Sequence, residues 1–329
     1  MNKFLAPELY CPFPYKINKY IDVLEDYALE WVVRFSIVED ESNYQRFCKS
    51  KLFILSAGAY PNCEIEELKI GNDWLSWIMT FDELCDKPYL GKQPEVLKSW
   101  HKRFLEILQG AELTSKDVPH GYALSNIRQR ILQIGSTEWL NYFVHNVKEY
   151  FQGCVQEAAY RAQEIVPDID TYIIMRRFTG VVEPVLDLIE LCDHLVIPDF
   201  LREYDLLKKI RMMANDIICW RNDIFSLSKE LAIGDVNNLV LVLHYQKQIS
   251  LDQAIKLVVE MHDQRVRDMI DLEASIVSFG EEIDAELTKY ISGINAWVRG
   301  DLNWYLNTGR YQTPQELEPV PLSGNIEPI

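Results

Sequence analysis

The sequence lacks the short motifs that mark the commonest enzyme classes. It contains no GxxxxGK(S/T) loop, no GxGxxG loop, no HExxH pair and no GxSxG elbow. Nucleotide hydrolysis, dinucleotide-dependent redox chemistry, zinc proteolysis and elbow-type hydrolysis are therefore without their signatures. The six histidines are dispersed, and no nucleophile is paired with a base. These absences favour metal-assisted chemistry on a phosphate-bearing molecule.

Positive charge is also scarce. The chain of 329 residues carries 33 lysines and arginines against 50 aspartates and glutamates, which gives a formal net charge of −17. Nucleic acids and anionic membranes are bound by clustered basic residues, so neither is expected as a partner. A small polyphosphate could be held only through bound cations.

Cysteine pairs and long apolar runs are missing as well. The cysteines are odd in number and scattered without a CxxC pair, which predicts neither a disulfide framework nor a zinc site and fits a reducing compartment. No apolar run reaches the length of a membrane span, and the opening MNKFLAPELY lacks the apolar segment of a secretory signal. The sequence therefore predicts a cytoplasmic protein without membrane insertion.

What the sequence does contain is helical periodicity. Between Pro198 and Pro314 there is no proline and little glycine, and apolar residues recur every three or four positions there, as they do in 20–35 and 140–162. No stretch alternates as a half-buried strand does. Polar, proline-containing loops are expected at 87–94, 115–121 and 165–169. The prediction is an all-α, single-domain bundle over residues 1–313 and a Pro-rich tail, 314–329, with a composition typical of disorder.

The first chemical candidate is FDELCD, residues 81–86. On a helix Asp82 and Asp86 share a face, with Glu83 about 100° away, so carboxylates converge at one point and could bind Mg²⁺. The alternative is a solvated helix end. The same face continues toward the N-terminus with apolar residues, which indicates a pocket with an apolar floor and a metal-binding mouth. These apolar residues are Leu75, Ile78 and Met79.

The second candidate is WRNDIFSLSKE, residues 220–230. Its Asn222, Ser226 and Glu230 stand four apart, so on a helix they lie within about 80° of one another. This strip could face water, because an apolar stripe occupies the opposite side. A second apolar stripe along its edge favours burial instead, and buried neutral oxygens with one carboxylate describe a hard-cation site. The second stripe consists of Leu207, Ala214, Ile218 and Phe225.

These two motifs, together with GRY at 309–311, resemble the class I terpene synthases of bacterial type, in which corresponding motifs occur in the same order. CPFP at 11–14, RRFTG at 176–180 and RGDLNW at 299–304 extend the resemblance over essentially the whole chain. It implies an α-helical bundle whose central cavity binds an isoprenoid diphosphate with three Mg²⁺ ions. In such a site Asp82, Glu83 and Asp86 would hold part of the ion cluster, and Asn222, Ser226 and Glu230 the remaining ion.

The resemblance also assigns Arg176 as the diphosphate-sensing arginine, with Arg177 as the alternative. Gly180, together with Pro184, is expected to interrupt a helix, and the family places an effector carbonyl at this break. Thr179 stands where some relatives have an acidic residue that links sensor and effector.

Further donors and cavity-lining residues follow from the same resemblance. Lys229, Arg310 and Tyr311 are expected to bind the diphosphate oxygens as the site closes. Ile78 and Met79 are expected to contact the hydrocarbon, and aromatic side chains to stabilise carbocations through their π faces, although ordinary core packing is the alternative for each. The aromatic candidates are Phe53, Trp77, Phe81, Phe178 and Trp304. In the first motif Glu83 replaces the second aspartate of many relatives, and activity is expected to survive this change.

The resemblance thus implies a Mg²⁺-dependent terpene cyclase that forms a hydrocarbon or alcohol. Farnesyl diphosphate is the favoured substrate because sesquiterpene synthases are the commonest members of the family at this chain length. A chain-elongating prenyltransferase and a non-catalytic helical protein that binds diphosphate are the alternatives. Exposed apolar helix faces would permit a homodimer. Product identity and stereochemistry cannot be read from the spacing of motifs.

Overall fold

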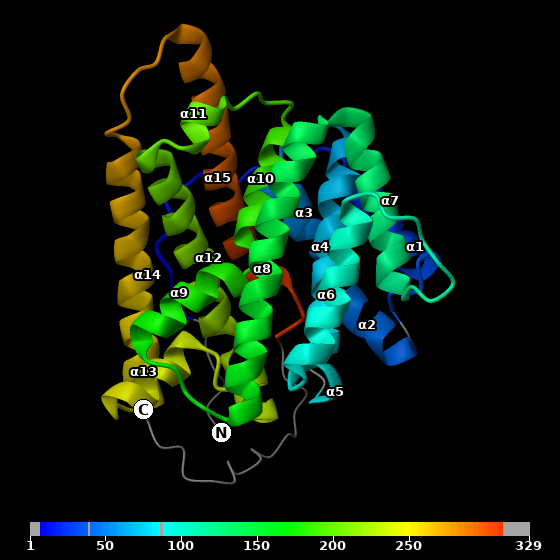
Figure 1. Cartoon of the computed structure of the whole chain (residues 1–329). Helices are drawn as coiled ribbons and strands as arrows, with labels where there is room; N and C mark the ends of the chain where they lie inside the picture. Colours follow the sequence, from blue (N-terminus) through cyan, green and yellow to red (C-terminus); the bar gives the residue numbers. More distant parts are fainter. Residues whose placement is uncertain (1–6, 39, 86–87, 312–329) are drawn as a thin grey trace.

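The computed structural model describes residues 7–38, 40–85 and 88–311, and in these ranges the chain forms α-helices and no strand (Figure 1). This confirms the all-α prediction. The predicted tail 314–329 lies outside the described residues. The helices are α1 Ile21–Arg34, α2 Glu41–Ser50, α3 Leu52–Ala59, α4 Ile65–Cys85, α5 Pro88–Gly91, α6 Pro94–Leu108, α7 Pro119–Ile134, α8 Thr137–Gln163, α9 Ile169–Thr179, α10 Val182–Cys192, α11 Asp199–Arg202, α12 Asp205–Ile233, α13 Leu239–Lys247, α14 Leu251–Glu273 and α15 Glu281–Asn307.

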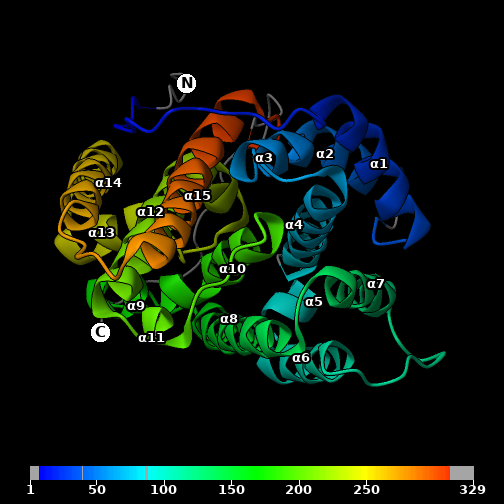
Figure 2. The same ribbon diagram turned by 90° about the horizontal axis from the view of Figure 1, so that it is seen from above.

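The helices surround α10, which lies inside the bundle. Helices α4, α8, α9, α12 and α15 all pack against it, and seen from above it stands within the ring that they form (Figure 2). Ten of its eleven residues are buried, the exception being Glu183. Its acidic face can be enclosed because Arg211 pairs with Glu183 and Asp187, and Arg202 with Glu190. The long helices α8, α12 and α15 pack around α10, and α14 lies outside α12 (Figure 2).

Polar side chains set the starts of several helices. Ser136, Asp168 and Asn238 accept hydrogen bonds from the backbone of α8, α9 and α13, and Ser250 forms a capping box at the start of α14. Proline, whose missing N–H is harmless in the first turn, begins α5, α6 and α7. The predicted loops are therefore shorter than expected: α5 lies within 87–94, and α7 begins inside 115–121.

One face of α4 builds an aromatic core with its neighbours. Trp74 and Trp77 stack at 5.6 Å, and Trp77 stacks in turn on Phe81 at 5.2 Å. Rings from α6 and α8 complete this aromatic cluster: His101, Phe104, Phe143 and Phe151. All of these side chains are buried. None of the helices in the described ranges has both the length and the hydropathy needed to cross a bilayer.

Candidate functional site

Two adjoining cavities lie between α3, α4, α8, α9, α10, α12, α15 and the residues that follow α15. The polar cavity, of about 90 Å³, and the apolar cavity, of about 150 Å³, share seven lining residues. The shared residues are Asp82, Tyr150, Arg176, Thr179, Asn222, Arg310 and Tyr311. The polar cavity adds Ser226, Lys229 and Glu230, and the apolar cavity adds Leu75, Ile78, Met79, Val185, Ile218 and Trp304 among others. An anionic head group joined to a hydrocarbon fits this pair of cavities.

The acidic motif of α4 lies where the two cavities meet. Leu75, Ile78, Met79 and Asp82 line the apolar cavity from one stripe of the helix, as their spacing of three and four predicts. Arg310, from beyond the end of α15, donates through Nη1 to Glu83 Oε1 at 2.8 Å and through Nη2 to Asp82 Oδ2 at 3.4 Å. The short segment after α15 is thereby held against the motif. Asp86 lies outside the described residues.

The second motif lines the polar cavity from α12. Asn222, Ser226 and Glu230 all border it, so the strip faces a cavity within the bundle and not its outer surface. The hydroxyl of Ser226 is buried and has no hydrogen-bond partner in the described part of the chain. Burial, reinforced by the neighbouring carboxylates Asp223 and Asp235, raises the pKa of Glu230 to about 8. A cation bound beside Glu230 would favour its ionised form.

The oxygens of Asn222, Ser226 and Glu230 fit a magnesium site that is completed by the phosphate oxygens of a substrate. The described residues contain no group of three His, Cys, Asp or Glu side chains arranged to hold a metal on their own. Asn222, Ser226 and Glu230 nevertheless offer an amide oxygen, an unpartnered hydroxyl and a carboxylate, which are the hard donors that Mg²⁺ prefers. Mg²⁺ is commonly bound by one or two carboxylates together with phosphate oxygens, so the substrate can complete such a site.

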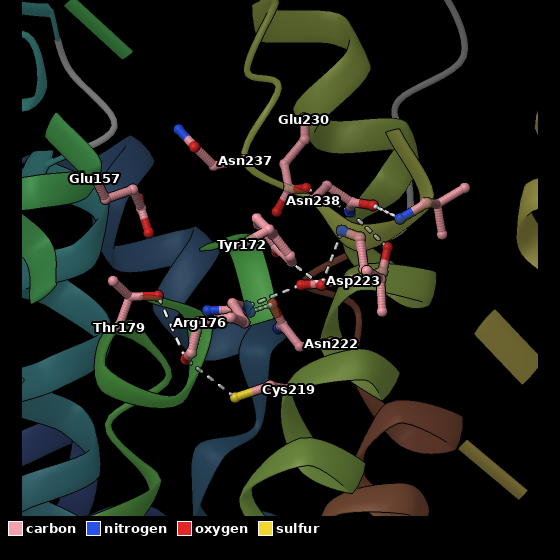
Figure 3. Close-up of polar contacts among 12 residues, drawn as sticks. Glu157, Tyr172, Arg176, Thr179, Cys219, Asn222, Asp223, Glu230, Asn237 and Asn238 are labelled. Atoms are coloured by element: carbon pink, nitrogen blue, oxygen red, sulfur yellow. Dashed lines mark hydrogen bonds and ion pairs between the residues drawn. The ribbon is translucent and has the colours of Figure 1, made fainter. Parts of the chain in front are cut away.

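Arg176 of α9 reaches across to this motif. Its Nη2 donates to Asn222 Oδ1 at 2.6 Å and its Nε to Asp223 Oδ1 at 3.0 Å (Figure 3). Arg177 points elsewhere, to Asp216, with two hydrogen bonds of 2.7 and 2.9 Å. It borders a different cavity, of about 540 Å³, between α8, α10 and α12. The structure thus places Arg176 on both site cavities and Arg177 on neither.

The interruption expected near Gly180 lies between α9 and α10. Gly180 ends α9 with an ordinary φ of −75°, whereas Val181 has a φ of 57°, which is rare for a β-branched residue. Pro184 is the third residue of α10, where its missing N–H costs little. A Cβ on Gly180 would lie 2.1 Å from the Cys219 sulfur. Glycine is therefore needed at position 180 because a side chain would have no room. The unfavourable backbone conformation is adopted by Val181.

The predicted aromatic residues divide between the site and the rest of the core. Trp304 lines the apolar cavity, and its indole N–H donates to the Ser50 carbonyl at 2.7 Å. The structure places the other four away from both site cavities. Trp77 and Phe81 belong to the aromatic cluster, on another stripe of α4 from Ile78 and Met79. Phe178 is 41% exposed and borders the cavity that contains Arg177, and Phe53 on α3 is half-buried while its neighbour Leu55 lines the site.

Three aromatic residues of the site were missed from the sequence. Tyr150 borders both cavities, and Trp297 and Tyr305 line the apolar one. The hydroxyl of Tyr305 accepts a hydrogen bond from Asn222 Nδ2 at 2.7 Å. Trp297 precedes Trp304 by two helical turns and so lies on the same face of the helix. The sequence around RGDLNW could therefore have predicted it as a second lining residue. Tyr150 stands in no motif.

Comparisons with known proteins identify the family and support the fold. The family described as Terpene synthase family 2, C-terminal metal binding, matches residues 73–268. Germacrene A synthase of Nostoc punctiforme is 54% identical over 97% of this chain and 98% of its own. The (+)-T-muurolol synthase of Roseiflexus castenholzii is 31% identical, covering 94% and 95%. The crystal structure of germacradien-4-ol synthase from Streptomyces citricolor matches with a TM-score of 0.82 and 25% identity, covering 92% of this chain and 99% of that one. The chain belongs to terpene synthase family 2 and is a class I terpene synthase.

Proposed function

We propose that the protein is a sesquiterpene synthase that converts farnesyl diphosphate into a cyclic hydrocarbon, with germacrene A as the expected product. The 54% identity to germacrene A synthase over nearly the full length of both chains carries the proposal. The name of the (+)-T-muurolol synthase specifies cyclisation of farnesyl diphosphate. The adjoining polar and apolar cavities provide separate places for the diphosphate and the C15 chain.

The head group would be held at the polar cavity. Arg176, Lys229, Arg310 and Tyr311 would supply donors to the diphosphate oxygens. The three cationic side chains would also stabilise the negative charge that develops on the diphosphate as the C–O bond breaks. Asp82 with its motif, and Asn222 with its motif, would hold Mg²⁺, three ions being expected. Bound Mg²⁺ neutralises the diphosphate and makes it a better leaving group.

The hydrocarbon would react in the apolar cavity. After ionisation, closure of a ten-membered ring between C1 and C10 and loss of one proton balance farnesyl diphosphate against germacrene A and diphosphate. Tyr150, Trp297, Trp304 and Tyr305 present aromatic rings to this space and can stabilise the cation. The apolar walls exclude water that would otherwise quench it. Because all seven cysteines are free, we further propose that the enzyme acts in the cytoplasm.

The proposal is tested by incubating the purified protein with geranyl, farnesyl and geranylgeranyl diphosphates, with and without Mg²⁺. Organic extracts are analysed by gas chromatography and mass spectrometry. A Mg²⁺-dependent C15 hydrocarbon from farnesyl diphosphate is the expected result. A linear C20 diphosphate formed when isopentenyl diphosphate is added, or no product from a folded protein that binds diphosphate, would contradict it.

A further inference from the structure

Asn238, in the connection between α12 and α13, uses its whole carboxamide in hydrogen bonds. The side chain is fully buried, and its Oδ1 caps α13 by accepting from the Val240 N–H at 2.8 Å. Its Nδ2 donates to Glu230 Oε2 and to the Asp223 carbonyl, each at 2.6 Å (Figure 3). A helix cap needs only the oxygen. The amide group therefore does something that capping does not explain.

The two acceptors of that amide belong to the motif of α12. Glu230 is the carboxylate with which this motif borders the polar cavity, where Asp82, Glu157 and Asp235 also lie. The side chain of Asp223 meets Arg176, the hydroxyl of Tyr172 at 2.8 Å and the backbone N–H of Leu239 at 3.0 Å. The start of α13 is thus tied both to the carboxylate proposed to bind metal and to the residue that holds the sensing arginine.

We propose that Asn238 is a positioning residue for metal binding, because its amide fixes the orientation of the Glu230 carboxylate. This inference rests on the proposed metal role of Glu230. A carboxylate on a long side chain loses rotational freedom when it binds an ion, and a fixed hydrogen-bond donor removes part of that loss beforehand. Partners that orient metal ligands in this way are typically worth 10–100-fold in metal affinity.

Two substitutions separate this role from capping. Asn238→Ser keeps an oxygen that can cap α13 but removes the amide donor, and Asn238→Asp keeps the cap and the shape but turns an oxygen toward Glu230. Asn146→Ser is the matched control. The amide of Asn146 also donates to a buried carboxylate, that of Asp187 at 2.7 Å, but Asn146 borders neither site cavity.

The experiment measures Mn²⁺ binding by electron paramagnetic resonance in the presence of inorganic diphosphate, with urea unfolding as the check on folding. We expect Asn238→Ser to weaken Mn²⁺ binding about 10–100-fold and Asn238→Asp to weaken it further, while Asn146→Ser stays within about twofold. In turnover assays the KM for Mg²⁺ should rise in Asn238→Ser, with kcat recovering at saturating Mg²⁺.

Glu230→Gln distinguishes this inference from the proposed function on which it rests. If Glu230→Gln loses Mn²⁺ binding while both folded Asn238 variants keep wild-type affinity, the positioning role is refuted and the metal role of Glu230 stands. If Glu230→Gln itself binds Mn²⁺ as the wild type does, the metal assignment fails and the role of Asn238 falls with it.

Discussion

Replacing Gly180 by alanine tests whether the break between α9 and α10 needs glycine for space. The backbone of Gly180, with φ −75° and ψ −6°, suits alanine without strain. An alanine Cβ would nevertheless lie 2.1 Å from the Cys219 sulfur and 3.2 Å from the Arg176 carbonyl oxygen. Heavy atoms in ordinary contact are about 3.5–4.0 Å apart, so the break or α12 has to move by about 1.5 Å.

The size of the effect on stability and on turnover depends on how far the break or α12 is displaced. Overpacking of a well-packed interior costs about 1–3 kcal/mol of stability, which a melting experiment detects. The same segment lines the apolar cavity and begins four residues after Arg176, and a misplacement of about 1 Å can cost roughly 100-fold in rate. We expect Gly180→Ala to lower kcat about 100-fold on farnesyl diphosphate, measured by gas chromatography of the products.

Cys219→Ala provides the decisive comparison. It removes the sulfur that the new Cβ would meet, so the double variant Gly180→Ala, Cys219→Ala should melt at a higher temperature than Gly180→Ala and recover most of the lost rate. Contacting residues typically show such coupling at about 0.5–3 kcal/mol. Wild-type turnover in Gly180→Ala, or a double variant as impaired as the single one, would refute the argument from space.

Three further predictions concern the site and the core. Asn222→Ala and Glu230→Ala should abolish Mg²⁺-dependent turnover and leave the circular dichroism spectrum unchanged; full activity in either would refute the metal assignment. Arg176→Lys, which keeps a cation opposite Asp223, should lower kcat about 100-fold, whereas Arg177→Gln should change it less than tenfold; equal losses would overturn the choice between the two arginines. Burial lowers the pKa of His101 to about 3, below its unfolded value of about 6.5, so the free energy of unfolding falls as the pH drops below about 6.5. His101→Phe should reduce the loss between pH 6.5 and 5 by about 2 kcal/mol in urea unfolding, and an unchanged pH dependence would exclude His101 as the titrating group.

The features of this structure that depend on the helical spacing of residues within one segment could be predicted from the sequence. Three-and-four spacing gave the helices, and the same spacing aligned Leu75, Ile78 and Met79 on one cavity wall. The strip from Asn222 to Glu230 could be placed on one face of a helix before any tertiary contact was known. Gly180 and Pro184 indicated the interruption after α9.

Tertiary placement could not be predicted in the same way. Periodicity shows which residues share a stripe, but α4 has two buried stripes, and nothing local says that Trp77 faces the aromatic cluster while Ile78 faces the cavity. Tyr150 reaches the site because α8 packs beside α9 and α10, which is a long-range contact. Asn238 could be read only as a helix cap, since its partner Glu230 becomes a neighbour through the turn between α12 and α13.

The burial of α10 among five neighbouring helices limits how new products can evolve. Val182 and Val185 line the apolar cavity from this helix, whose other faces are packed against the rest of the bundle. A change of side-chain volume there is felt on several helices at once, and interiors packed this densely tolerate little. Leu75 and Ile218 line the same space from α4 and α12, each of which packs on α10 from one side. Divergence of product specificity should therefore accumulate on the cavity walls that α4 and α12 provide, while α10 changes slowly among enzymes that make different hydrocarbons.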